Sequence, residues 1–179
     1  MLTVSWSSLS MFKNNMFIPD VSPAIKRSVA RALLYIEELC ARRGIPFTKQ
    51  QLNNFVFEFE PEDGGGGFCF AREDFNLRED ANRDGESAGI PICIALLSRI
   101  LNKAPASDIA ATGIISSTGK LTRIGGLPHK IEAAVGKRRI LLPREMMEEF
   151  EGLKEEEKRG MTAEYADYFE EFILTIFGI

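Results

Sequence analysis

The segment from residue 88 to about residue 103 constrains the fold more than any other part of the chain, because its middle is almost wholly apolar. A helix that is apolar on all sides is stable only when other elements bury it. The sequence therefore predicts a central helix here, with further layers packed around it. Its apolar residues are Ile90, Ile92, Ile94, Ala95, Leu96, Leu97, Ile100 and Leu101.

A second helix is predicted upstream, from about Pro23 to Arg43. Ser22 can cap its first turn, Pro23 suits the first helical position, and Gly44 ends the helix. Its apolar residues recur at helical spacing, whereas its charged residues are expected to face solvent. The apolar stripe consists of Ile25, Val29, Leu33, Ile36 and Cys40, and the solvated residues are Arg27, Arg31, Glu38 and Arg42.

The remainder of the chain alternates short strands with helices. Strands are predicted within 1–20 (a strand or a hairpin), over 54–60 and 139–143, and over 108–115 and 120–124 around a turn. Helices are predicted from about Pro128, over 144–158 on the surface, and over 162–177. Because the elements alternate without an internal repeat, we predict a mixed α/β (α+β) fold, in a single compact domain over 1–179. The core residues of the first and last of these helices are Ile131, Ala134 and Val135, and Tyr165, Phe169, Phe172, Ile173 and Ile176.

The composition excludes several classes of protein. With 45% apolar and 27% charged residues, the 179-residue chain resembles an ordinary globular domain. Its net charge of -4 provides no general attraction to nucleic acid or to anionic membranes. No apolar run approaches the roughly 20 residues of a membrane span, and the N-terminus does not resemble a signal peptide. We therefore expect a cytoplasmic protein with no nucleic-acid partner and no membrane partner.

Cysteine and histidine are too sparse for a disulfide framework or a metal site. Cys40, Cys69 and Cys93 are widely spaced and form no CxxC pair, so free thiols are expected. His129 is the only histidine in the sequence. It excludes a metal site built on histidines and leaves one histidine base for any Ser–His or Cys–His mechanism. We predict no metal and no cofactor in this chain.

Two glycine-containing segments invite a phosphate-binding interpretation, and both fail it. Residues 62–83 include four consecutive glycines, but no Lys-Ser/Thr pair follows them, so a mobile surface loop is predicted. Residues 113–120 approach a Walker A motif. However, one residue too many separates the glycines, and Leu121 stands where Ser or Thr must bind magnesium. No ATPase domain is therefore expected.

A serine flanked by small residues precedes the central helix, in the segment Asp84-Gly85-Glu86-Ser87-Ala88-Gly89. Small neighbours let a substrate backbone approach, and a helix N-terminus offers N–H groups to a developing oxyanion. Ser87 is thus a candidate nucleophile. A helix N-cap is the alternative interpretation, since serine is common at that position.

A lysine occupies the first turn of the next predicted helix, in Ile124-Gly125-Gly126-Leu127-Pro128-His129-Lys130. A helix N-terminus and apolar walls both disfavour a positive charge, so the amine can be held neutral near pH 7. A neutral Lys130 can accept the proton of a serine hydroxyl, as in the Ser–Lys variant of nucleophile and base.

Taken together, the two segments resemble the proteolytic domain of the Lon proteases. The residues from Asp84 to Gly89 match the family's D-G-x-S-A-G, and Gly125, Gly126, Leu127 and Lys130 match its G-G-L-x-x-K. Ser87 and Lys130 are 43 residues apart, which is the spacing associated with the bacterial members. Thr112-Gly113 lies between the two motifs, where the family has Thr-Gly, and the segment 140–143 resembles a later family strand, so the likeness covers roughly residues 22–179.

The resemblance implies a serine endopeptidase that hydrolyses unfolded proteins through an acyl-enzyme. Ser87 would be the nucleophile and Lys130 the general base. Thr112 would be a supporting hydroxyl near the lysine, and Asp84 a polar wall. The backbone near Gly85, Glu86 and Ala88 would form the oxyanion hole, and His129 is expected to face solvent.

The sequence departs from the family pattern at Glu86, where proline is usual, and at Ile114, where many members carry an acid. A Glu86 carboxylate facing Lys130 would raise the pKa of the amine and weaken it as a base. The glycine-rich segment at 62–83 is an insertion that either covers or lengthens the substrate groove, or is a tolerated disordered loop.

The resemblance also implies partners. These are unfolded polypeptide substrates, a homo-oligomer in the form of a ring of six, and an AAA+ ATPase motor as a partner or as a missing domain. The chain would then be either a stand-alone protease or the proteolytic domain of a larger ATP-dependent protease. ATP and magnesium would be needed only by that motor. The alternative function is a Lon-fold module without proteolytic activity, acting as an oligomerisation or binding scaffold for an AAA+ or DNA-handling protein.

Overall fold

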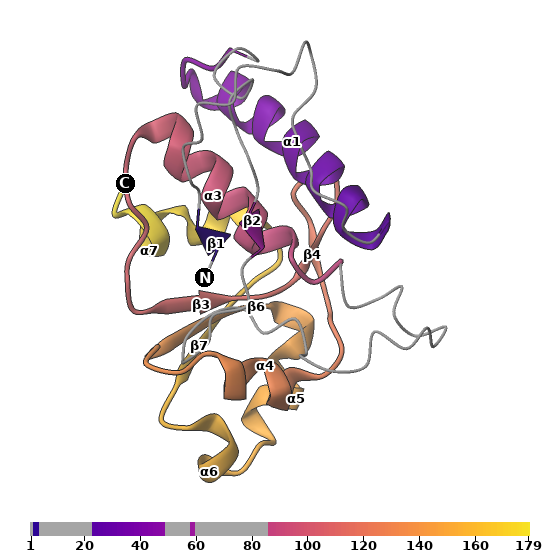
Figure 1. The fold of residues 1–179 in the computed structure, drawn as a ribbon, viewed down its shortest axis with the longest axis vertical. Helices are drawn as coiled ribbons and strands as arrows, with labels where there is room; N and C mark the ends of the chain where they lie inside the picture. Colours follow the sequence, from indigo (N-terminus) through magenta and orange to yellow (C-terminus); the bar gives the residue numbers. More distant parts are fainter. Residues whose placement is uncertain (1, 4–22, 49–57, 60–85) are drawn as a thin grey trace.

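The computed structural model describes residues 2–3, 23–48, 58–59 and 86–179. A three-stranded parallel sheet separates two layers of helices (Figure 1). The helices α1 (Pro23–Arg43), α3 (Gly89–Leu101) and α7 (Ile173–Phe177) lie on one side, and α4 (Leu127–Ala133), α5 (Met147–Glu151) and α6 (Glu155–Lys158) lie on the other. The predicted mixed α/β (α+β) class is confirmed.

The sheet has the strand order β3 (Ile109–Ala111), β6 (Arg139–Pro143), β7 (Thr162–Ala166). The central strand, β6, pairs Arg139 with Ile109 on one side and with Thr162 on the other. Its apolar run is typical of a parallel strand that is buried on both faces. Because successive side chains alternate between faces, Leu141 joins one hydrophobic cluster, and Ile140 and Leu142 join the other.

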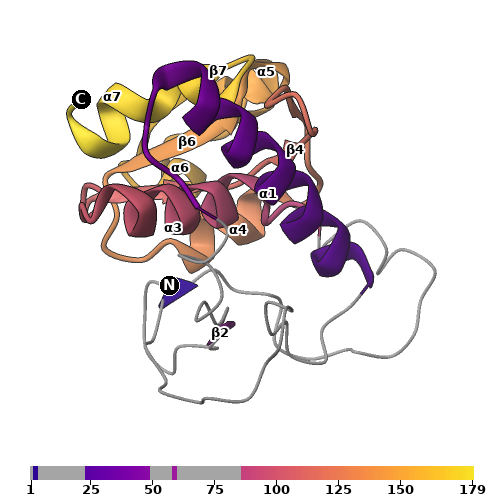
Figure 2. The same ribbon diagram turned by 90° about the horizontal axis from the view of Figure 1, so that it is seen from above.

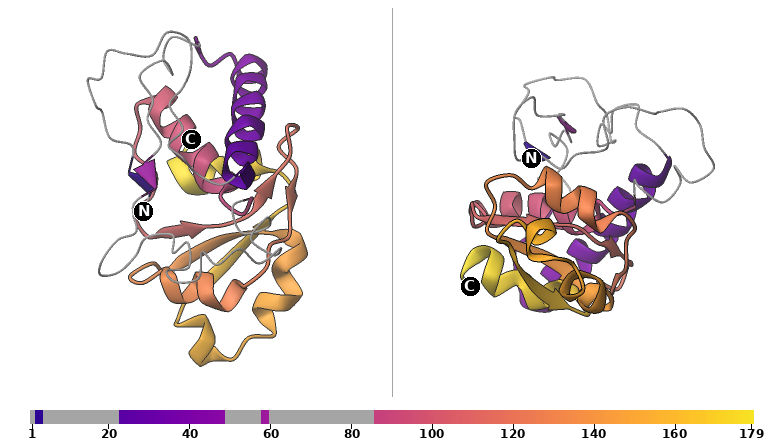
Figure 3. Two further views of the ribbon diagram at one scale, coloured as in Figure 1. Left: turned by 45° about the vertical axis from the view of Figure 1, so that its right-hand side comes forward. Right: turned by 90° about the horizontal axis from the view of Figure 1, so that it is seen from below.

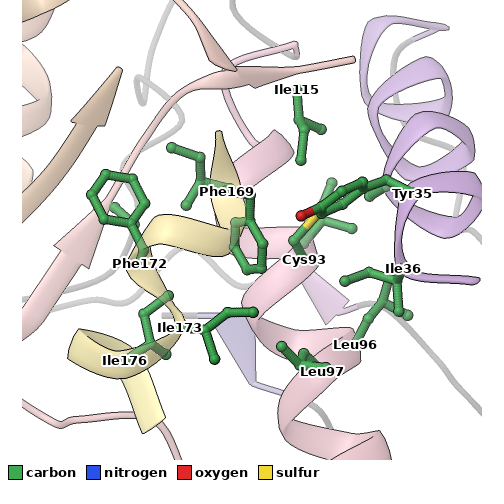
Figure 4. Close-up of a cluster of buried hydrophobic side chains, with 14 of the residues drawn as sticks. Tyr35, Ile36, Cys93, Leu96, Leu97, Ile115, Phe169, Phe172, Ile173 and Ile176 are labelled. Carbon is green, nitrogen blue, oxygen red and sulfur yellow. The ribbon is translucent and has the colours of Figure 1, made fainter. Parts of the chain in front are cut away.

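The first cluster is built mainly by α1, α3 and α7 with the short 3-10 helix η3 (Phe169–Phe172). Figure 4 shows Tyr35 of α1, Cys93 of α3 and Phe169 of η3 meeting near its centre. The rings of Tyr35 and Phe169 are in edge contact, with centroids 5.9 Å apart. The cluster fills the space between the two long helices, which lie side by side in Figure 2.

Both predicted long helices are confirmed. Helix α1 has the expected bounds, and Gly44 follows its last residue with a φ of +63°, while the Ile45 N–H donates to the Cys40 carbonyl. Its buried face is wider than the predicted stripe because Tyr35 and Leu39 belong to it. Helix α3 is buried as predicted over most of its length, and begins at Gly89.

The second cluster lies under the other face of the sheet. It is formed by α4, by the 3-10 helix η2 (Arg144–Met146) and by α5. Figure 3 shows these helices opposite the layer that contains α1 and α3. Val135 does not join this cluster, contrary to the prediction, because α4 ends at Ala133 and Val135 is 54% exposed. The buried members are Ile124, Leu127, Ile131, Ala134, Ile140, Leu142, Met146, Phe150 and Met161.

The predicted strand over 108–115 is two strands in the structure. Its first part is β3, and its second part, β4 (Ile114–Ile115), pairs antiparallel with β5 (Leu121–Thr122) around the predicted turn. The chain changes partner at Thr112 and Gly113. The Thr112 N–H still donates to the Leu141 carbonyl of β6, whereas the Gly113 N–H donates to the Ser87 carbonyl.

The helix predicted over 162–177 is wrong in its first part. Residues 162–166 form β7, which pairs parallel with the whole length of β6. The apolar spacing from Tyr165 onwards mimicked a helix, but β6 offered a free edge that satisfies the backbone of this segment. Phe169, Phe172, Ile173 and Ile176 are buried as predicted, and Tyr165 packs against the second cluster.

Near the N-terminus, β1 (Leu2–Thr3) pairs antiparallel with β2 (Glu58–Phe59). The rest of the segments predicted over 1–20 and 54–60 and the whole glycine-rich segment at 62–83 lie outside the described residues, as do Ser22 and Cys69. Cys40 and Cys93 are buried free thiols, as predicted. Among the described helices, none combines the length and apolar character needed to span a bilayer.

Candidate active site

Ser87 lies immediately before α3 and is 6% exposed. It does not cap this helix, because the N-cap position is Ala88 and no side chain makes a cap hydrogen bond there. The Ser87 hydroxyl instead accepts a hydrogen bond from the Lys130 amine, with 3.2 Å between Oγ and Nζ. The structure thus brings together the two residues that the sequence singled out.

Lys130 lies on α4, after the Gly125-Gly126 pair. Gly126 occupies the N-cap with a φ of +67°, a conformation that favours glycine, and its carbonyl accepts the Lys130 N–H at 3.3 Å. The Lys130 side chain is partly buried. Its neighbour His129 is exposed, as predicted.

The backbone of Ser87 is held by the segment where β3 ends. The Ser87 carbonyl accepts the Gly113 N–H at 2.9 Å and the Thr112 hydroxyl at 3.3 Å. The Gly113 carbonyl in turn accepts the Ile90 N–H. Thr112 was predicted to support the lysine, but its buried hydroxyl donates to the serine backbone.

Two glycines near Ser87, Gly89 and Gly113, allow neighbouring segments to approach each other closely. A Cβ atom on Gly89 would lie 2.7 Å from the Ile115 nitrogen, and a Cβ on Gly113 would lie 2.5 Å from the Ile90 Cδ1. Both distances are closer than real contacts allow. The sequence suggested that small residues admit a substrate backbone, but at Gly89 the protein's own strand β4 fills the space.

Glu86, the residue before Ser87, is paired with α1. Its carboxylate accepts bonds from Arg27 Nε at 3.0 Å and from Arg31 Nη1 at 3.3 Å. Partial burial alone would raise the pKa of this carboxyl, but the hydrogen bonds and positive charges of the two arginines outweigh burial and lower the pKa from its ordinary value of 4.5. The carboxylate is therefore directed to the arginines of α1.

These α1 residues were missed by the sequence analysis, which assigned Arg27 and Arg31 to a solvated face. The available signal was an acidic residue beside the candidate nucleophile, since a partly buried carboxylate needs a cationic partner.

Asp84 and Gly85 lie outside the described residues. Ala88 is buried, with its carbonyl bonded to the Ile92 N–H. No group of three His, Cys, Asp or Glu side chains suited to a metal ion occurs within the described ranges.

Comparison with known proteins gives matches to one family. The family model described as the Lon protease (S16) C-terminal proteolytic domain matches residues 79–178. A mitochondrial Lon protease homolog of Caenorhabditis briggsae is 38% identical over 97 residues, which is 53% of this chain and 10% of the relative. Lon protease 2 of Hydrogenovibrio crunogenus is 36% identical over 99 residues, and Lon protease of Haemophilus influenzae is 36% identical over 93 residues. These two matches cover 54% and 51% of this chain, and 11% and 12% of the relatives.

The family match defines a proteolytic domain of the Lon type. The chain belongs to the Lon protease (S16) C-terminal proteolytic domain family. It spans about a tenth of the length of the curated relatives that it matches.

Proposed function

We propose that this domain is a serine endopeptidase in which Ser87 is the nucleophile and Lys130 is the general base. The observation that carries the proposal is the 3.2 Å hydrogen bond between the Lys130 amine and the Ser87 hydroxyl. This distance lies within the range expected of a nucleophile and its base. The family match supports the same class of chemistry.

In the proposed reaction, the Ser87 oxygen attacks the carbonyl carbon of a peptide bond as Lys130 takes the hydroxyl proton. The tetrahedral intermediate collapses, the carbon–nitrogen bond breaks, and Lys130 returns the proton to the leaving amine. A water molecule then attacks the acyl-enzyme. Lys130 accepts a proton from this water and later donates it to the Ser87 oxygen, which restores the free enzyme.

The Ala88 N–H is the proposed oxyanion donor. It follows the nucleophile directly, and it forms no hydrogen bond with any residue that the structure describes. A preorganised donor of this kind stabilises the negative oxygen of the intermediate. Gly85 and Glu86 were predicted to contribute to the same region, and for them this stays a prediction.

The mechanism requires Lys130 to be uncharged when it accepts the proton. Two features of the site favour this. The Lys130 side chain is partly buried, which disfavours its charged form. The negative charge of Glu86 is paired with the positive charges of Arg27 and Arg31 of α1.

Unfolded polypeptides and short peptides are the proposed substrates, and a ring of six copies is the proposed assembly. Both follow from the family resemblance. Residues 1–179 are proposed to act as one proteolytic domain with no cofactor of its own, and a motor domain would supply any ATP-driven unfolding.

A cytoplasmic location stays a prediction. An inactive scaffold is less well supported, because Ser87 and Lys130 are both present and bonded to one another.

The test measures hydrolysis of an unfolded protein and of fluorogenic peptides by the wild type, Ser87→Ala and Lys130→Ala, without ATP. His129→Ala is the matched control, because it removes an exposed side chain next to Lys130. We expect the two dyad variants each to lose about a hundredfold or more in kcat, with the double variant no worse, since residues acting as one unit are not additive. The control should retain activity.

Hydrolysis that survives in Ser87→Ala would contradict the mechanism and indicate another nucleophile. An inactive wild type that nevertheless forms a stable oligomer would favour the scaffold. Labelling of Ser87 by a fluorophosphonate provides an independent measurement, because it requires an activated serine but no bound peptide.

A further inference from the structure

Three residues from one stretch of α1 hold Glu86, the residue that precedes the proposed nucleophile. Arg27 and Arg31 bind the two carboxylate oxygens of Glu86. Ser28, between them, donates its hydroxyl to the Glu86 backbone carbonyl at 3.1 Å. Both the side chain and the backbone of Glu86 are therefore tied to the same helix, although more than 50 residues separate them in the chain.

We propose that Arg27, Ser28 and Arg31 form a clamp on Glu86 that positions Ser87 for catalysis. The inference rests on the proposed function, since positioning matters only if Ser87 reacts. These residues are positioning residues, because they act through Glu86 and bind no reacting atom.

The clamp completes a set of restraints on both sides of Ser87. On one side, Glu86 is fixed by α1, and its carbonyl also accepts the Gly89 N–H at 3.3 Å. On the other side, the Ser87 carbonyl is bonded to Gly113 and Thr112. With its neighbours anchored to two different elements, the Ser87 hydroxyl is held toward Lys130. A displacement of about 1 Å at such a site can reduce the rate by about a hundredfold.

The location of the ion pairs suits this role. The Glu86 side chain is 20% exposed, whereas those of Arg27 and Arg31 are 45% and 37% exposed. Exposed ion pairs contribute little to overall stability. A geometric effect on Ser87 is thus the larger expected consequence of losing them, and kcat is the parameter that should respond.

The variant Arg27→Met/Arg31→Met removes both charges and keeps much of the apolar stem of each residue. Arg42→Met is the matched control. Arg42 also lies on α1, is 45% exposed like Arg27, and forms ion pairs with Glu38 and Glu170 away from the site. We expect kcat to fall about tenfold in the double variant with KM changed less than twofold, and neither to change in the control.

Combining the arginine substitutions with Glu86→Gln tests whether the arginines act on kcat through Glu86 or through a general loss of stability. Adding Glu86→Gln to Arg27→Met/Arg31→Met should cause little further loss of kcat, because the interaction is already absent. Ser28→Ala should show a smaller loss of the same kind. An unchanged kcat in the arginine variant, in an enzyme that Ser87→Ala inactivates, would overturn the clamp.

Amide hydrogen exchange tests the clamp without any activity. The Gly89 and Gly113 amides, which donate to Glu86 and to Ser87, should exchange at least several-fold faster in Arg27→Met/Arg31→Met than in Arg42→Met. Equal exchange in the two variants would overturn the clamp even if the wild type hydrolyses nothing. If the wild type hydrolyses nothing but Arg27→Met/Arg31→Met exchanges faster than Arg42→Met, the clamp stands as a structural contact and the proposed function is rejected.

Discussion

The Ser87 hydroxyl and the Lys130 amine lie 3.2 Å apart, although they belong to opposite layers of the domain. Ser87 precedes α3, which packs in the first hydrophobic cluster, and Lys130 lies on α4, which packs in the second. The two layers are separated by the sheet (Figure 3). The geometry of the pair therefore depends on how both layers pack against the same three strands.

The contact between Gly89 and β4 should tolerate no side chain. In Gly89→Ala the new methyl group meets backbone atoms of Ile115 and Gly113 at under 3.0 Å, so we expect a loss of about 2 kcal/mol in the free energy of unfolding. Gly125→Ala is the control, because a Cβ added there would have no heavy atom within 4 Å, and its effect should stay within about 0.5 kcal/mol. Urea denaturation measures both. Equal effects would show that β4 can move away at little cost.

The Thr112 hydroxyl should stabilise the serine turn. Thr112→Val keeps the shape of a side chain that is 1% exposed but removes the hydrogen bond to the Ser87 carbonyl. We expect a loss of about 1 kcal/mol in unfolding free energy, since the carbonyl keeps its bond from Gly113. Thr162→Val, which removes an exposed hydroxyl bond of 3.5 Å, should cost less. A larger loss of unfolding free energy in Thr162→Val than in Thr112→Val would contradict this stabilising role of the Thr112 hydroxyl.

The clamp on Glu86 should make stability depend on pH. The two arginines lower the pKa of Glu86 in the folded protein below its ordinary value of 4.5, so the folded state favours the carboxylate. The resulting stabilisation is complete above the unfolded-state pKa and is lost as the pH falls through the folded-state pKa. Wild type should exceed Glu86→Gln in stability from about pH 5 upward, and the difference should shrink below about pH 4.

Urea denaturation of both proteins between about pH 3 and pH 7 measures this difference. In the Arg27→Met/Arg31→Met background the Glu86→Gln substitution should have a smaller and flatter effect, because the arginines that lower the carboxyl pKa are gone. If the stability advantage of wild type over Glu86→Gln instead grew as the pH fell, the pH dependence would have the opposite sign. That result would contradict the ion pairs of Glu86.

Removal of the hydroxyl group should destabilise the fold at one tyrosine and not at another. The Tyr35 hydroxyl is buried and has no hydrogen-bond partner within the described part of the chain, so Tyr35→Phe should leave stability unchanged or raise it by up to about 1 kcal/mol. The Tyr165 hydroxyl donates to Glu151 at 2.8 Å, so Tyr165→Phe should lower stability by about 0.5 kcal/mol. Thermal unfolding distinguishes them, and a clear loss in Tyr35→Phe would indicate a polar partner for its hydroxyl.

Local patterns were sufficient to predict much of this domain. Helical periodicity with its terminating glycine predicted α1, the apolar run predicted α3, and the run at 139–143 predicted β6. The two short motifs selected Ser87 and Lys130 through their joint resemblance to the Lon family. These features need only neighbouring residues for their recognition.

Contacts between distant segments decided the rest. Residues 162–166 became a strand because β6 offered a parallel edge, and Gly113 left the sheet to bind the backbone of Ser87. The Glu86 carboxylate turned to α1 because two arginines more than 50 residues away neutralise it. Backbone hydrogen bonds and buried charges must be satisfied by whichever partners folding brings near, and a sequence pattern does not specify those partners.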